Sequence, residues 1–516
     1  MPEVARPRTP TAPAVASVAV PMLLAVLVAL VRASTKPLWR DEYATAMHAS
    51  LDSGGLARAV SHVDAVLGPY YALVHPLQPL GSIDEAWYRV PSIIAFVVAV
   101  GGTALLALRW WGAPAALVGG AVLALNPVML SQATNARPYA ISVAFLVLAL
   151  LSLDVALRAG TRGWLAWLGY GLGAAFATLL HPFAAVAVAT SAMLLFGRPA
   201  RTVVHWLLAS VPAGAVGVTM LVANSGQSRQ LAWLDRYDLR RTIATLADVA
   251  AVSPGRAVAF DLAALAVVGV MTVATLLALL RADSDAGDDR LGRVRPVAFA
   301  AVLLLAPAVV LFAGSWLVSP MLTERYLIWS AVGGALLVGA AAGAAAAHVG
   351  ARSLAAGMLA VVVATGVLAF ALERGIARPA GPSSVAQIVE ALEASAAPGD
   401  RLVVVQRYWE GGVAYEFART AGDDAYAGAI RDRAPDGAQP LADLRVVTGV
   451  DPLTTAPAAD LSGDGALWLV MTAPITEDDH AGLGADLAGC IAGIDSEPTM
   501  QVGAFRLEQV DCGGAS

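Results

Sequence analysis

Long, nearly unbroken runs of apolar residues dominate this sequence, and short polar segments separate them. About eleven runs approach the 20 or so apolar residues that a helix needs to cross the hydrocarbon of a bilayer. Hydrophobic residues make up 58% of the 516 positions, charged residues only 14%, and the mean hydropathy is +0.67. Since a soluble core of this size cannot bury so much apolar surface, we expect a mainly α, polytopic membrane protein.

The first apolar run, residues 14–31, follows a short arm that carries Arg6 and Arg8. A cleaved secretory signal is one interpretation of this arrangement. The run is long for the apolar part of a signal, and the exit at residues 31–34 is a poor cleavage site. An uncleaved first span is therefore the favoured interpretation.

Further spans are expected along most of the remaining chain, each with approximate ends. They lie near 90–108, 113–131, 138–157, 164–180, 182–197, 203–223, 257–280, 297–318, 326–347 and 354–373. His181-Pro182 divides one long apolar stretch, either as a turn at the membrane surface or as a kink. The turn is favoured because the whole stretch is too long for one crossing.

The orientation follows from the arginines of the short loops, which tend to stay in the cytoplasm. With a cytoplasmic N-terminus, the inside loops carry Arg109, Arg158, Arg162, Arg198, Arg201, Arg281, Arg290, Arg293, Arg295 and Arg352. An odd number of spans then places residues 374–516 outside. The predicted protein is a multi-pass plasma-membrane protein with a membrane domain over 1–373 and two long external loops, 32–89 and 224–256.

The tail, residues 374–516, has the pattern of a small extracytoplasmic α/β domain. Residues 383–394 predict an amphipathic helix, and 402–405 predict a buried strand. A helix-like stretch follows at 410–419, with strands at 466–471 and 502–510, which together favour a partly parallel sheet. Cys490 and Cys512 form a disulfide if the compartment is oxidising; two free buried thiols are the alternative.

The predicted topology gathers polar residues at the external membrane face. They are Asp41, Glu42, Asp64, Arg137, His181 and Arg325. Each has a structural explanation too: Asp41 can cap a helix, Arg137 can reach toward lipid phosphates, and Arg325 can pair with Glu324. Single histidines and tyrosines here are commonly interfacial anchors.

Carboxylates and arginines at one external face suit a sugar transfer from an anionic lipid-linked donor. A polyprenyl-phosphate sugar leaves behind a phosphate, whose growing charge arginine forks stabilise. The acceptor hydroxyl loses a proton as it attacks, and one carboxylate can serve as the general base. No basic patch with interleaved aromatics indicates a nucleic acid partner.

At these residues the sequence resembles the GT-C superfamily of membrane glycosyltransferases. The resemblance is to the protein O-mannosyltransferase and lipid A aminoarabinose transferase branch and to actinobacterial polyprenyl-phosphate-mannose mannosyltransferases. It rests on Trp39-Arg40-Asp41-Glu42, His62-Val-Asp64 with Gly68-Pro-Tyr-Tyr71, Arg89-Val-Pro-Ser92, Ala136-Arg-Pro-Tyr139 and Glu324-Arg-Tyr326. These motifs cover most of the membrane part, and the tail resembles relatives only weakly.

The resemblance implies roles for particular residues. Asp41 is the catalytic base, with Glu42, Asp64, Tyr70 and His181 contacting the acceptor or supporting the site. Arg137, Tyr139 and Arg325 bind the donor phosphate. Where relatives usually have His/Lys-Pro-Pro, this chain has Asp64 and Gly68-Pro69-Tyr70, so the resemblance does not identify the acceptor.

The expected partners are a polyprenyl-phosphate sugar, membrane lipids and a lipid, glycan or protein acceptor. Mannose is the expected sugar, because the Ala/Arg-rich composition indicates a high-GC genome and actinobacterial relatives commonly use it; arabinose is the near alternative. No cofactor is required, and a divalent metal is compatible with the resemblance. A transporter or flippase of a polyprenyl-linked glycan, or a non-enzymatic assembly or sensor protein, is the alternative to a transferase.

Overall fold

The computed structural model describes a large part of the chain. The described residues are 11–33, 38–51, 53–62, 64–80, 85–159, 163–224, 234–250, 265–266, 268–269, 272–273, 287–347, 357, 384–395, 401–404, 412–413, 416, 438–441, 444–448, 466–472, 500–502 and 505–510. The chain divides into two compact units. The membrane unit comprises Met1–Ser34 and Arg89–Arg378, and the second unit comprises Thr35–Tyr88 and Pro379–Ser516.

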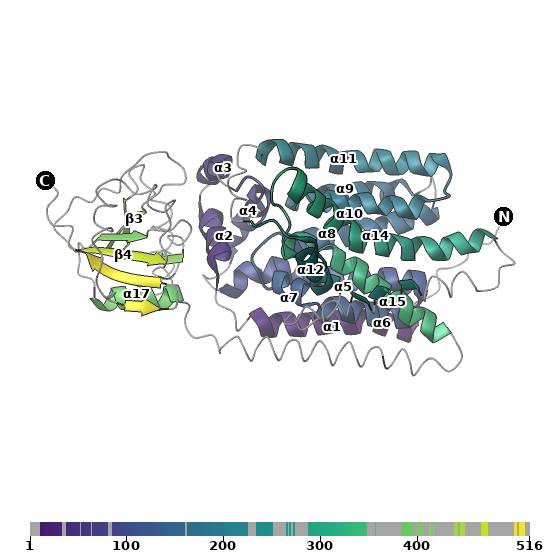
Figure 1. Ribbon diagram of the computed structural model, residues 1–516, viewed down its shortest axis with the longest axis horizontal. Helices are drawn as coiled ribbons and strands as arrows, with labels where there is room; N and C mark the ends of the chain where they lie inside the picture. Colours follow the sequence, from purple (N-terminus) through teal and green to yellow (C-terminus); the bar gives the residue numbers. More distant parts are fainter. Residues whose placement is uncertain are drawn as a thin grey trace. The chain divides into compact units, whose positions relative to one another are not determined.

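The membrane unit consists of helices, and its long helices run side by side in Figure 1. In chain order they are α1 (Ala12–Ala33), α5 (Glu85–Trp111), α6 (Ala113–Leu125), α7 (Pro127–Ala133), α8 (Tyr139–Ala159), α9 (Trp164–Leu180), α10 (Ala184–Thr190), η3 (Ser191–Leu195), α11 (Ala200–Asn224), α12 (Leu239–Ala250), α14 (Gly287–Leu317), η5 (Glu324–Leu327) and α15 (Ser330–Ala347).

Six of the described helices are long and apolar enough to cross a membrane, which confirms a polytopic membrane protein. The bent pair α6 and α7, with an angle of 63° at its break, makes a seventh if it is one span. Helices α9 and α10–η3 are apolar but shorter. The spans predicted over 257–280 and 354–373 fall almost entirely outside the described residues, so the predicted count of about eleven stays a prediction.

Hydrogen bonds at the helix ends fix the relative directions of α5, α8 and α9. The Ser92 hydroxyl near the start of α5 donates to the Arg137 carbonyl just before α8, at 3.1 Å. At the other ends of the same two helices Arg109 pairs with Asp154. Helix α9 runs the opposite way, because the Ser142 hydroxyl early in α8 donates to the Ala177 carbonyl late in α9 at 2.8 Å. The turn predicted at His181-Pro182 is present between α9 and α10.

Some helix surfaces in the membrane unit are exposed and apolar, and others pack closely against neighbouring helices. Leu23 of α1 and Leu208 of α11 are 68% and 65% exposed, as an apolar side chain facing lipid can be. Helices α6 and α15 instead approach closely through glycines. A Cβ at Gly119 would lie 2.9 Å from the Ala335 carbonyl oxygen, and one at Gly339 would lie 2.7 Å from that of Ala115. Small residues at such crossings let the backbones pack without a hydrophobic driving force.

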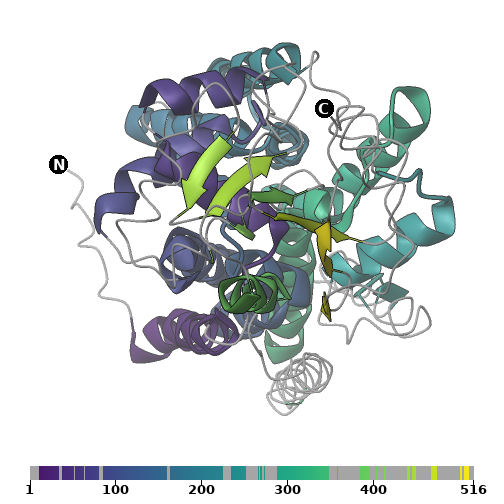
Figure 2. The same cartoon turned by 90° about the vertical axis from the view of Figure 1, so that its left-hand side faces the viewer.

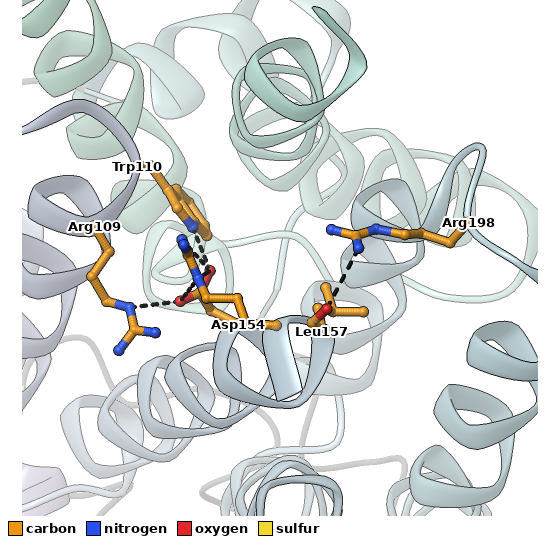
Figure 3. Close-up of polar contacts among 6 residues, drawn as sticks. Arg109, Trp110, Asp154, Leu157 and Arg198 are labelled. Atoms are coloured by element: carbon orange, nitrogen blue, oxygen red, sulfur yellow. Dashed lines mark hydrogen bonds and ion pairs between the residues drawn. The ribbon is translucent and has the colours of Figure 1, made fainter. Parts of the chain in front are cut away.

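One carboxylate organises the charged end of α5 and α8 (Figure 3). The Asp154 carboxylate pairs with Arg109 Nε at 2.6 Å and with Arg158 Nη2 at 3.1 Å, and accepts a bond from the Trp110 indole at 2.9 Å. Arg198 donates to the Leu157 carbonyl at 3.4 Å. The arginines predicted for the cytoplasmic loops after these spans therefore share one end of the membrane unit.

The second unit contains short helices, α2 (Arg40–Ser50), α3 (Ser53–His62), α4 (Gly68–Val74) and η1 (His75–Leu80), and a sheet with α17 (Ser384–Ser395). The strands are β1 (Arg401–Val404), β2 (Ala438–Leu441), β3 (Leu444–Thr448), β4 (Leu467–Thr472), β5 (Met500–Val502) and β6 (Phe505–Val510), in the order β2-β3-β1-β4-β6-β5. Strand β1 is parallel to β3 and β4, and the other pairings are antiparallel. Figure 2 shows these strands in a view turned by 90° from that of Figure 1.

Several tail elements coincide with those predicted from the sequence. Helix α17 buries the apolar face formed by Val385, Ile388, Val389 and Leu392, and it packs against β5 and β6. Strands β2 and β3 were not predicted from the sequence. Strand β2 contains Pro440 and lies at the sheet edge, where a missing amide hydrogen is tolerated. Cys490 and Cys512 lie outside the described residues, so their disulfide stays a prediction.

The Asp154 cluster generates a stability prediction. Asp154→Ala should lower the free energy of unfolding by about 1–3 kcal/mol, since it leaves two arginines without their shared carboxylate. Trp110→Phe removes a single hydrogen bond and should cost only about 1 kcal/mol. Thermal unfolding of both purified variants in the same detergent measures the difference. Equal melting temperatures for Asp154→Ala and the wild type would show that the cluster does not hold α5 and α8 together.

Candidate functional site

Helix α2, in the second unit, carries the acidic motif. The helix begins at Arg40 with Trp39 as N-cap, and Glu42 returns to cap it: the Trp39 amide donates to Glu42 Oε2 at 3.3 Å. Glu42 is fully buried, whereas Asp41 is half-buried. The sequence analysis gave the capping role to Asp41, and the structure shows Glu42 in that role.

The C-terminal half of α2 is held by the rest of the first external loop. The His48 ring stacks on the Tyr71 ring of α4, with centroids 4.6 Å apart and planes 9° from parallel. His75 Nδ1 lies 2.8 Å from the Ala49 carbonyl oxygen. The orientation of α2 is thus determined by aromatic packing and hydrogen bonds from α4 and η1.

Asp64 and Tyr70, both predicted site residues, belong to the same supporting structure. Asp64 has φ of 57°, a left-handed conformation that Asp tolerates better than most residues. Its carboxylate accepts a hydrogen bond from the Tyr71 hydroxyl at 2.9 Å, and its carbonyl oxygen accepts from the amides of Leu67 and Gly68. Tyr70 is fully buried in α4. Asp64 therefore shapes the turn that leads into α4.

The membrane unit holds the predicted donor-binding residues, together with the predicted supporting residue His181, in three separate segments. Arg137 lies in the bend between α7 and α8, is only 5% exposed, and its amide donates to the Asn135 carbonyl at 2.8 Å. Tyr139 begins α8. His181 joins α9 to α10, and Arg325 lies in η5.

An aromatic cluster joins these three segments. The His181 ring lies 5.4 Å from that of Tyr139, 4.8 Å from Tyr326 and 5.1 Å from Trp329, measured between ring centroids. Tyr139 and Tyr326 are 6.3 Å apart, and Phe183 lies 5.5 Å from Tyr326. Tyr326 directly follows Arg325, and Tyr139 follows Arg137 by two residues, so the structure brings the Arg137 and Arg325 segments together.

His181 is neutral in this environment. Burial lowers the pKa of His181 to about 3, and the positive charge of Arg325 contributes to the shift. Its Nδ1 atom is buried and has no hydrogen-bond partner among the described residues. A neutral imidazole with an unused ring nitrogen can donate or accept a hydrogen bond, but it is not a cation that could bind phosphate.

Two more arginines stabilise the same end of the membrane unit. Arg89 is fully buried and donates through Nη1 to the Ala33 carbonyl at 3.1 Å, which joins α5 to the end of α1. Arg32 Nε donates to the Thr134 hydroxyl at 3.2 Å. Both polar residues of the motif Arg89-Val-Pro-Ser92 thus have a structural role. Arg89 holds the end of α1, and Ser92 holds the backbone at Arg137.

The sequence analysis did not single out Trp329, Phe183 or Ser142. Trp329 is fully buried, and its indole donates to the Ser142 hydroxyl at 3.1 Å. A tryptophan three residues after Tyr326 was the available signal, but interfacial anchoring explains such a residue equally well.

The structure therefore assembles the predicted residues in two sets. Asp41, Glu42, Asp64 and Tyr70 belong to the second unit, and Arg137, Tyr139, His181 and Arg325 to the membrane unit. The convergence of Asp41 with Arg137 and Arg325 stays a prediction. Over the described part of the chain, no three His, Cys, Asp or Glu side chains gather as metal ligands would.

The second external loop, predicted over 224–256, is described over residues 234–250. It forms α12, whose first turn is capped by Asp238: the Arg241 amide donates to Asp238 Oδ1 at 2.6 Å. Asn126, between α6 and α7, donates through Nδ2 to the Val249 carbonyl at 3.0 Å. Helix α12 also packs against η5, so this loop contributes to the surroundings of the Arg325 segment.

Comparison with known proteins identifies the fold. No protein-family model and no curated protein matches the sequence. Among solved structures, the chain is similar to ArnT from Cupriavidus metallidurans in the apo state, with a TM-score of 0.51 and 15% identity over 96% of this chain and 97% of that one. It is also similar to the same protein bound to undecaprenyl phosphate, with a TM-score of 0.50 and 13% identity over 97% and 98%. The chain thus has the fold of ArnT, as expected for a GT-C-type membrane core.

Proposed function

We propose that this protein is an inverting glycosyltransferase that moves a sugar from a polyprenyl-phosphate donor to a hydroxyl acceptor at the outer face of the plasma membrane. The observation that carries the proposal is the meeting of the Arg137, His181 and Arg325 segments at one end of a membrane unit. The fold supports it, because one ArnT structure of that fold holds undecaprenyl phosphate.

Arg137 and Arg325 are the proposed ligands of the donor phosphate. Arg137 is largely buried and its backbone is held by Ser92, so the guanidinium enters the site from a fixed position. A guanidinium forms bidentate hydrogen bonds to phosphate oxygens, which strengthen as the phosphate gains charge on leaving the sugar. Tyr139, two residues after Arg137, is the proposed third ligand of the phosphate.

Asp41 is the proposed general base. The acceptor oxygen attacks the anomeric carbon, its proton passes to the Asp41 carboxylate, and the bond from that carbon to the phosphate oxygen breaks with inversion. The departing phosphate needs no proton, so one carboxylate suffices and no acid partner is required. Glu42, engaged at the N-cap, supports Asp41 by fixing the first turn of α2.

The aromatic cluster is the proposed contact of the donor sugar. Tyr326 and Phe183 are half-buried, and the apolar C–H face of a sugar can stack on an aromatic ring. The unused Nδ1 of His181 offers a hydrogen bond to a sugar hydroxyl. We propose mannose as the sugar, with arabinose as the near alternative.

Loss of the base tests the mechanism directly. Asp41→Asn should lower kcat by at least about 100-fold, because it removes the proton acceptor while keeping shape and polarity. The assay uses purified protein, labelled polyprenyl-phosphate mannose or arabinose, and membrane extract as acceptor. Turnover near the wild-type rate by a folded Asp41→Asn variant would remove Asp41 from the mechanism.

Replacement of Arg137, a proposed ligand of the donor phosphate, should weaken donor binding. Arg137→Ala should raise the donor KM about tenfold or more, the value of a charged hydrogen bond to an ionised group. Arg109→Ala, at the opposite end of α5, is the matched control and should leave the donor KM unchanged. An unchanged donor KM in Arg137→Ala would contradict the assigned role.

The neutrality of His181 predicts the shape of a pH profile. A histidine with a pKa of about 3 does not titrate between roughly pH 5 and pH 8, so it cannot be the base seen in that range. His181→Gln, which keeps hydrogen-bonding capacity, should lower kcat/KM without moving the apparent pKa of the pH–rate profile. A profile that loses its acidic limb in His181→Gln would show that His181 titrates during catalysis.

A further inference from the structure

A buried hydrogen bond links the first external loop to the tail within the second unit. The Tyr43 hydroxyl of α2 donates to Glu416 Oε1 at 2.9 Å, across 373 positions of sequence. Both side chains are 1% exposed. Removing either side chain should lower the stability of the unit, because the remaining partner would be a buried polar group without its hydrogen bond.

The tail is shaped to receive the Tyr43 ring. Gly412, one helical turn before Glu416, lies under that ring: a Cβ at this position would be 2.9 Å from Tyr43 Cδ2 and 3.1 Å from Cε2. Val413 beside it is fully buried. A glycine at 412 therefore lets the tail segment approach the ring face, while Glu416 bonds the hydroxyl at the ring's end.

These contacts connect the N-terminal turn of α2 to the tail. His48 and His75 anchor the C-terminal half of the helix. Near the N-terminus, Glu42 caps the first turn from within the helix, and Tyr43 ties that turn to the tail. Asp41 precedes Tyr43 by two residues, so a rotation or shift of this turn moves both side chains together.

We propose that Glu416 is a positioning residue: by holding the Tyr43 hydroxyl, the tail sets the N-terminal turn of α2 and so the place of the Asp41 carboxylate. This inference rests on the proposed role of Asp41 as base. A leucine or methionine at 416 would fill the space without the cost of burying a carboxylate. Glu416 instead accepts a directional hydrogen bond from the Tyr43 hydroxyl. This bond restricts movement of the Tyr43 ring along its long axis, which apolar packing alone would not do.

The experiment compares Tyr43→Phe, Glu416→Ala and the double variant in the full-length protein. Tyr43→Phe removes one oxygen atom and Glu416→Ala removes the acceptor. Each should lower kcat about tenfold or more and leave the donor KM unchanged, because a shift of about 1 Å in a reacting group is enough for such a loss. The double variant should be no worse than the poorer single variant, since both break one bond.

Two further variants separate positioning from folding. Glu416→Gln keeps an oxygen that accepts from Tyr43 and should restore most of kcat. Glu508→Gln is the control, because Glu508 is a buried carboxylate of the same unit that pairs with Arg506 on β6. It should leave kcat unchanged even where it lowers the melting temperature.

Hydrogen exchange gives a readout that does not depend on the assay. Glu416→Ala and Tyr43→Phe should speed amide exchange in residues 40–46 more than in α4, whereas Glu508→Gln should not. Selective exchange together with a kcat loss that Gln rescues supports the inference. Normal kcat in Tyr43→Phe, additive losses, or an equal kcat loss from Glu508→Gln would overturn it.

The two proposals fail in different ways. If Asp41→Asn is inactive while Tyr43→Phe and Glu416→Ala turn over normally, the positioning role is wrong and the proposed function stands. If Asp41→Asn is fully active, the proposed base is wrong, and the positioning inference falls with it even where hydrogen exchange shows that Glu416 orders α2.

Discussion

The arrangement of the predicted site residues within the membrane unit depends on the hydrogen bonds of the Ser142 hydroxyl. It donates to the Ala177 carbonyl of α9 at 2.8 Å and accepts from the Trp329 indole at 3.1 Å. One oxygen atom on α8 thereby fixes the end of α9 and the segment that follows η5. Because hydrocarbon offers no competing hydrogen bonds, a buried hydroxyl satisfied in both directions defines one arrangement of these segments. Tyr139, His181 and Tyr326 take their mutual positions from it.

The sequence predicted what depends on local periodicity and composition. Apolar runs marked α1, α5, α8, α11, α14 and α15 because each crosses lipid alone, and lipid selects for length and hydropathy. The turn at His181-Pro182 was equally local. The N-cap of α2 was predicted at Asp41, two residues too late, because acidic residues suit both the cap and the first turn of a helix. Only coordinates show that the N-cap is Trp39 and that Glu42 reaches its amide.

The rest of the candidate site is formed by contacts between distant parts of the chain, which no local pattern encodes. Ser142 and Trp329 are 187 positions apart, and Tyr43 and Glu416 are 373 apart. Glu416 lies in a stretch with no motif, and a glutamate in a predicted helix is normally solvated. Its burial against Tyr43 was therefore not predictable. The same holds for His181, whose low pKa depends on burial and on the charge of Arg325.

Each of the two units organises its own set of predicted site residues. The membrane unit contains Arg137, Arg325 and the neutral His181. These residues lie at or near the ends of helices that pack against one another. The second unit contributes a carboxylate on a short helix, which is too short to be stable by itself. Helix α2 needs anchors at both ends, and it finds them in α4 with η1 and in the tail. These contacts explain why residues 35–88 group with the tail in one compact unit.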